Sequence, residues 1–167
     1  AGRPKGASGY AELMELAPAM REAGLQPHLF AKTETFVEWM PQLLTLGIPL
    51  VIDHMAAAGP SDIRANDPRL DAILAPLREG RLWMKLTVVR RSTQGPDYGD
   101  ARPFHDAFVA ANSDRMLWGS DWPLVNLADP PNIGQLINLF DSWTSDSAIR
   151  HKVFVSNPAA CFGFRSD

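Results

Sequence analysis

The chain has 167 residues, of which 46% are hydrophobic and 21% charged, with a formal net charge of −3 at pH 7. This composition is typical of one globular domain, and the slight negative charge excludes the basic footprint of a nucleic-acid-binding protein. No apolar stretch approaches the roughly 20 residues that a membrane span requires, so a membrane partner is not expected either. A single cysteine, Cys161, and an N-terminus without the apolar run of a signal peptide lead us to expect a cytoplasmic location.

Two periods of apolar patterning alternate along the chain, and this alternation is the main clue to its fold. The helical period predicts helices over residues 11–23, 35–46, 67–79, 103–112, 132–143 and 147–155. Runs rich in β-branched and other apolar residues predict strands over residues 25–30, 48–55, 82–89 and 115–121. A helix between successive strands provides each crossover connection, which predicts a parallel sheet and an α/β fold.

Four parallel strands can be half of an eight-stranded barrel or a small doubly wound sheet. The doubly wound sheet usually carries a glycine-rich turn that binds phosphate, and neither GxGxxG nor GxxxxGK[ST] occurs in this sequence. The two longest expected loops, about 55–66 and 88–102, both follow the carboxyl ends of strands, where barrels carry their active sites. The pattern therefore favours the barrel.

Three of the predicted strands end in polar residues that a purely structural strand does not need. His54 ends the second strand, the third leads to Arg91, and Asp121 ends the fourth. Because the carboxyl ends of parallel strands share one rim, we expect these side chains to converge. A carboxylate can activate water, an imidazole can polarise a carbonyl group and a guanidinium can hold an anion, which suits hydrolysis. Zinc binding by His54 and Asp121 is equally compatible with these residue types.

Each candidate also has a purely structural interpretation. His54 could be a structural residue at a strand end, and Asp121 could cap the following turn. Arg91 could be a surface arginine, and Lys85 could only balance the charge of Asp53 or of a neighbouring carboxylate. The residue pattern alone leaves these alternatives open.

Other residues with reactive or aromatic side chains receive weaker expectations. His28 alternates with Phe30 on the first strand, so both are expected to face the barrel interior. Trp122 follows Asp121 and could shape a pocket at the rim. His105 and His151 lie on amphipathic helices, and we expect both to face solvent.

Four segments of the chain resemble the amidohydrolase-related family. They are VIDHM (51–55), WMKL followed by Arg-Ser (83–92), DRMLWGSDWP (114–123) and SNPAACFGF (156–164). This family includes hydrolases of 2-pyrone-4,6-dicarboxylate and other small lactones, with metal-dependent decarboxylases as more distant members. The combination of DHM with a downstream WGSDWP is the specific part, and the resemblance extends over the chain from about residue 10.

The resemblance implies a (β/α)₈ barrel of the metal-dependent hydrolase type, of which residues 1–167 form a single domain containing about the last four βα units. By motif, His54 and Asp121 match the family's catalytic residues, and they are the ligands where a divalent metal such as zinc is used. Arg91 matches an arginine that binds a substrate carboxylate, and Phe30 falls where the lactonase branch has a tyrosine near the substrate. The full set of expected substrate-binding residues is Arg91, His28, Phe30 and Trp122.

The chain also departs from the family pattern. It contains no HxH motif, its first strand maps to about the fifth of eight, and a typical barrel needs about 250 residues. The family's DHMG appears here as DHMA, with Ala56 at the glycine position, and its KLSG appears as KLTV. We therefore expect the N-terminal strands with their HxH pair to be missing from this sequence.

Three functions remain open at this point. The first is a hydrolase of a small carboxylated lactone or related cyclic ester or amide, with Asp121 as general base and with or without a metal. The second is a zinc-dependent decarboxylase of the same superfamily. The third is an inactive half-barrel that serves as an assembly module, either as a homo-oligomer or with a companion N-terminal half. In that half-barrel we expect Leu50, Ile52 and Leu117 to face the open interior.

Overall fold

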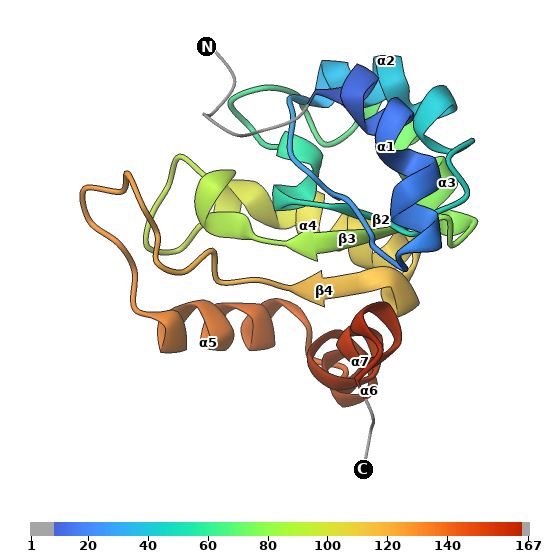
Figure 1. The fold of residues 1–167 in the computed structure, drawn as a ribbon. Coiled ribbons are helices and arrows are strands. Elements are labelled where there is room, and N and C mark those ends of the chain that lie inside the picture. Colours follow the sequence, from blue (N-terminus) through green and yellow to red (C-terminus); the bar gives the residue numbers. More distant parts are fainter. Residues whose placement is uncertain (1–8, 165–167) are drawn as a thin grey trace.

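A parallel sheet of four strands forms the centre of the computed structural model, which describes residues 9–164 (Figure 1). The strands are β1 (His28–Leu29), β2 (Leu50–Ile52), β3 (Leu82–Leu86) and β4 (Met116–Trp118). Their order in the sheet follows the chain, and all three pairings are parallel. The predicted parallel sheet and its four strands are thereby confirmed, although each strand is shorter than the pattern indicated.

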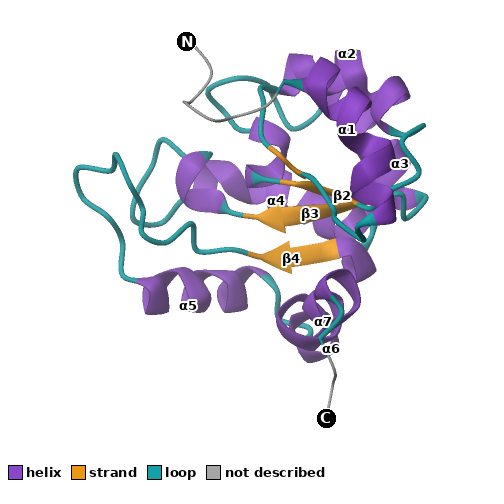
Figure 2. Cartoon of the chain, in the orientation of Figure 1, coloured by secondary structure: helices purple, strands orange, loops and turns teal. Residues whose placement is uncertain are grey.

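Helices connect the strands and surround the sheet (Figure 2). They are α1 (Tyr10–Glu22), α2 (Thr33–Leu43), α3 (Pro68–Arg78), α4 (Arg102–Ala111), α5 (Ile133–Trp143), α6 (Ser147–His151) and α7 (Asn157–Phe162). A π-helical turn, Lys152–Ser156, joins α6 to α7. Gly47 and Gly80, which follow α2 and α3, both adopt positive φ (64° and 70°), a conformation that glycine reaches without steric cost.

The two faces of the sheet are covered differently. Leu50, Ile52 and Met84 point to the face that packs against α2, α3 and α4, where they join the main hydrophobic core. Because side chains alternate along a strand, Val51, Trp83 and Leu117 point to the opposite face, which is the interior side in a barrel. There they form a smaller cluster that is covered by Cys161 of α7.

Two sequence-based expectations about burial are wrong. Leu50, Ile52 and Leu117 are all buried instead of facing an open interior. Leu50 and Ile52 face the helix layer, and Leu117 is covered by the C-terminal helix. His105 is also buried, with an exposed fraction of 1%, because its ring packs edge-on against Phe140 and Trp143 beside α5. The expectation that His151 faces solvent is confirmed.

The carboxyl ends of the strands meet at one rim, where the long connecting segments begin; those that follow β3 and β4 lie on the left of Figure 1. These segments run from β2 to α3, from β3 to α4 and from β4 to α5. Within residues 9–164, β1 and β4 each pair with a strand on one side only. None of the helices in this part of the chain is long and apolar enough to cross a bilayer.

Candidate active site

His54 and Asp121 lie side by side at this rim, although they follow different strands. The distance from Nε2 of His54 to Oδ1 of Asp121 is 3.7 Å, and the two side chains are 19% and 24% exposed. This distance is too long for a direct hydrogen bond, but one water molecule can contact both atoms from the solvent side. The structure therefore brings together the two residues that the motifs had singled out.

The backbone that carries His54 is strained. His54–Ala57 form a turn in which all four residues adopt left-handed φ angles, between 51° and 55°. The turn contains no glycine, and a left-handed conformation costs an L-residue roughly 1–2 kcal/mol. Asp121 is left-handed as well, with φ of 62°. Strain of this kind persists only where neighbouring contacts hold it, and it is typical of functional sites.

Arg90 is the basic residue that contacts Asp121, and it was not among the predicted site residues. Its Nε donates to Oδ2 of Asp121, while its terminal Nη2 donates to the carbonyl oxygen of Val125 at 2.7 Å. Arg90 ends the short 3₁₀ turn Val88–Arg90 that follows β3. The two adjacent arginines, Arg90 and Arg91, are evident in the sequence, but the family motif pointed only to Arg91 as a site residue.

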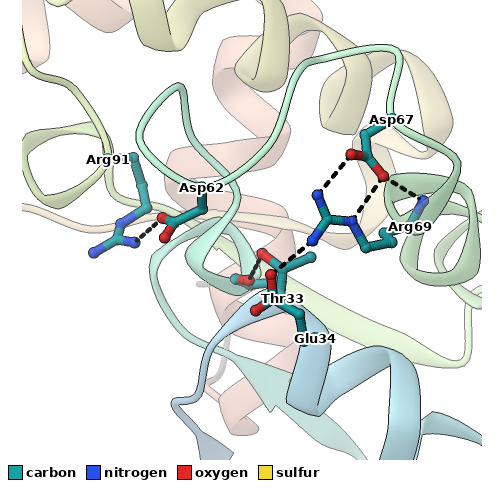
Figure 3. A network of polar contacts seen from close by, with 7 residues as sticks. Thr33, Glu34, Asp62, Asp67, Arg69 and Arg91 are labelled. Atoms are coloured by element: carbon teal, nitrogen blue, oxygen red, sulfur yellow. Dashed lines mark hydrogen bonds and ion pairs between the residues drawn. The ribbon is translucent and has the colours of Figure 1, made fainter. Parts of the chain in front are cut away.

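Arg91 lies beside the His54 turn instead of Asp121. Its Nη1 donates to the carbonyl oxygen of Ala57 at 3.2 Å and lies 3.6 Å from Oδ2 of Asp62 (Figure 3). Burial lowers the pKa of this guanidinium, and within residues 9–164 its buried Nε has no hydrogen-bond partner. The segments approach so closely here that a Cβ on Gly59 would lie 2.5 Å from the Arg91 carbonyl oxygen.

A second polar group lies on the interior face of the sheet. Nζ of Lys85 is 2.6 Å from Oδ1 of Asp53 and 2.9 Å from Nδ1 of His28. The expected pairing of Lys85 with Asp53 is thereby confirmed. Phe30 places its ring edge-on against His54, with centroids 5.1 Å apart, and remains 61% exposed. His28, Lys85 and Phe30 thus extend the candidate site from the rim into the interior side.

The electrostatics of the site favour a neutral imidazole. Burial is the main cause that lowers the pKa of His54, and the cations Arg91 and Arg90 lower it further. The carboxylates of Asp121 and Asp53 oppose this shift without overcoming it. His28 shows the same direction, because burial and the charge of Lys85 lower its pKa. At neutral pH, His54 is therefore a hydrogen-bonding group without charge.

Trp122 follows Asp121 and has the most exposed large apolar side chain at the rim, with an exposed fraction of 76%. Its backbone N–H donates to the hydroxyl of Ser120 at 3.2 Å. The indole is thus largely free to meet solvent or a ligand at the rim.

The residues present do not by themselves fit a catalytic zinc ion. Such an ion takes three protein ligands, and the described part of the chain contains no group of three His, Cys, Asp or Glu side chains close enough to share one. His54 and Asp121 supply two, and Oδ2 of Asp121 is already paired with the Arg90 cation. A metal at this site needs further ligands from outside residues 9–164. The zinc-dependent decarboxylase that the sequence left open therefore also requires such additional ligands.

Four parallel strands that bring a histidine, an aspartate and an arginine to one rim have the arrangement of part of a (β/α)₈ barrel. The family model described as "Amidohydrolase" matches residues 12–164, and the chain belongs to this family. This confirms the family and the fold class that the four motifs implied.

Among curated proteins, the chain is similar to 4-sulfomuconolactone hydrolase of Rhizobium radiobacter, with 40% identity over 123 residues, covering 69% of this chain and 40% of that protein. It is also similar to 2-pyrone-4,6-dicarboxylate hydrolase of Comamonas testosteroni, with 30% identity over 159 residues, covering 88% of this chain and 52% of that protein. The chain thus spans about half the length of the curated relatives it matches.

A crystal structure of an Agrobacterium tumefaciens protein without ligand superimposes with a TM-score of 0.86 and 27% identity. The match covers 98% of this chain and 59% of that one. The arrangement of strands, helices and rim in residues 9–164 is therefore that of part of a larger barrel.

Proposed function

We propose that this chain supplies part of the active site of a hydrolase that opens small lactones carrying an acidic substituent. The observation that carries the proposal is the 3.7 Å approach of His54 Nε2 to Asp121 Oδ1 at the rim of the sheet. The names of both curated relatives support the substrate class, because each names the hydrolysis of a lactone that bears a sulfo or carboxylate group.

In the proposed reaction, Asp121 is the general base. Arg90 occupies its Oδ2 and leaves Oδ1 directed toward His54, so Oδ1 takes a proton from the attacking water. The water oxygen forms a bond to the lactone carbonyl carbon while His54, neutral and protonated on Nε2, donates a hydrogen bond to the carbonyl oxygen. The bond between the acyl carbon and the ring oxygen then breaks, and the ring oxygen leaves with the electron pair. The proton held by Asp121 returns to that oxygen, which regenerates the carboxylate.

The substrate's acidic group is proposed to bind Arg91, which uses Nη1 for the protein and retains further donors. A guanidinium binds planar anions through paired hydrogen bonds, and partial burial strengthens such contacts. Phe30, whose ring packs against His54, and Trp122, which follows Asp121, offer exposed aromatic surface against which a flat lactone ring can stack. His28 and its partner Lys85 provide polar contacts deeper on the interior face.

The test is a substrate panel presented to a complete barrel that contains this chain's residues. The panel pairs 2-pyrone-4,6-dicarboxylate and 4-sulfomuconolactone with an uncharged lactone of similar ring size, each assayed with and without a chelator. Ring opening of an acidic lactone with little turnover of the uncharged one supports the proposal. No turnover of any acidic lactone contradicts it.

A further inference from the structure

The left-handed turn His54–Ala57 needs support from outside itself. Hydrogen bonds at its two ends are local: the Ala56 N–H donates to the Asp53 carbonyl oxygen at 3.1 Å, and the Ala58 N–H donates to that of Met55 at 2.9 Å. All four residues have side chains that disfavour positive φ. The conformation therefore depends on contacts made by neighbouring elements.

One of these contacts comes from α2. The hydroxyl of Thr33, the first residue of that helix, donates to the carbonyl oxygen of Ala56 at 3.0 Å (Figure 3). Thr33 is fully buried, and a β-branched side chain has few rotamers to choose from, so the position of its hydroxyl oxygen is well defined. Inside the protein, a carbonyl oxygen deprived of this donor would be left unsatisfied.

The start of α2 is itself held in place. Glu34, the next residue, accepts a hydrogen bond of 2.7 Å from Arg69 in the first turn of α3. Arg69 also binds both carboxylate oxygens of Asp67, at 2.9 Å and 2.7 Å, and Figure 3 shows this group beside Thr33. The segment that leaves the His54 turn therefore returns, through Asp67 and Arg69, to the helix that supports the turn.

We propose that Thr33 is a positioning residue, whose hydroxyl holds the left-handed turn and thereby places the His54 imidazole against Asp121. Within residues 9–164, the Thr33 hydroxyl bonds to the Ala56 carbonyl oxygen and not to either of those side chains. It acts through the Ala56 carbonyl, two residues from His54. The inference relies on the proposed function only for the roles of His54 and Asp121.

The experiment compares Thr33→Val, which keeps the shape and removes the hydroxyl, with Thr33→Ser, which keeps the hydroxyl. Thr144→Val is the matched control, because Thr144 is also buried but its hydroxyl has no partner among the described residues. NMR on the complete barrel, with isotope labels in residues 54–57, gives two readouts. Strong cross peaks between amide and α protons of the same residue mark positive φ in residues 54–57, and the His54 imidazole signals mark the ring's surroundings.

We expect Thr33→Val to lose the strong cross peaks at Ala56 and Ala57 and to shift the His54 imidazole signals. Thr33→Ser and Thr144→Val should retain the wild-type pattern. If Thr33→Val does not fold, the double variant Thr33→Val with Ala56→Gly should restore the fold and the cross peaks, since glycine adopts this φ without support. An unchanged turn and unchanged His54 signals in Thr33→Val, or an unfolded double variant, would overturn the proposal. Because no readout depends on turnover, failure of the lactonase assignment would leave this result intact.

Discussion

Asp121 presents its two carboxylate oxygens to different partners: Oδ2 receives the Nε–H of Arg90, and Oδ1 faces His54 Nε2 at 3.7 Å. The arginine therefore fixes the direction of the carboxylate without occupying the oxygen that faces the histidine. This division between an anchored oxygen and an available one is what a general base at this rim requires.

Replacing Arg90 tests whether this residue orients the Asp121 carboxylate. In the complete barrel, Arg90→Gln should lower kcat on the order of tenfold to a hundredfold, because a misdirected carboxylate loses its alignment with the attacking water. KM should change less, since substrate binding is assigned to Arg91. Steady-state kinetics on an acidic lactone measure both constants. A change confined to KM would show that Arg90 binds substrate instead of orienting Asp121.

Arg91→Ala addresses the binding of the acidic group. Loss of a charge-assisted contact of about 1.5–3 kcal/mol should raise KM for an acidic lactone by roughly ten- to a hundredfold. Arg91 also contacts the Ala57 carbonyl oxygen, so the variant could disturb the turn and affect every substrate. The ratio of kcat/KM between acidic and uncharged lactones separates these effects. If this ratio equals the wild-type value, Arg91 does not bind the acidic group of the substrate.

The buried His105 predicts acid sensitivity of the fold. Burial lowers its pKa below the 6.5 of an unfolded chain, so the unfolded state binds more protons as the pH falls. The stability that His105 contributes is therefore complete above pH 6.5 and is lost as the pH falls from there through the folded pKa. Each unit by which folding lowers the pKa of His105 corresponds to about 1.4 kcal/mol in the free energy of unfolding.

The measurement is urea unfolding between pH 7.5 and pH 5. His105→Phe, which suits the aromatic surroundings of Phe140 and Trp143, should flatten the decline relative to wild type. The exposed His151→Gln serves as the control and should leave the decline unchanged. Equal acid sensitivity in wild type and His105→Phe would assign the effect to other groups.

The chain of 167 residues by itself should associate and should not hydrolyse lactones. Association is expected because Phe30, Phe162 and Phe164 are exposed, and two sheet edges in residues 9–164 have no neighbouring strand. Inactivity is expected because the family's HxH pair is not in this sequence. Sedimentation velocity at micromolar concentration, with a lactone assay on the same sample, checks both. A monodisperse monomer that turns over lactone would refute them.

The sequence predicted the features that follow from strand order. Because parallel strands end at a common rim, the positions of His54 and Asp121 at strand ends were enough to expect their approach. The parallel sheet itself followed from helices placed between apolar strands.

Features that depend on the direction of a single side chain or on tertiary packing were not accessible in this way. Arg90 and Arg91 are adjacent, yet one turns to Asp121 and the other to Ala57. The left-handed turn at His54 contains no glycine, so nothing in the sequence indicated its positive φ angles. His105 lies on an amphipathic helix, but α5 covers the side of α4 that the period assigned to solvent.

The most direct test of the central assignment is turnover by Asp121→Asn in the complete barrel. Asparagine keeps the shape of the side chain and, like aspartate, tolerates the left-handed φ of 62° at this position, so the fold should be retained. It does not accept the proton of the attacking water, and kcat for an acidic lactone should therefore fall by roughly 10²–10⁴-fold, with an unchanged circular dichroism spectrum. Turnover close to that of wild type would contradict the assignment and leave Asp121 as a structural partner of Arg90.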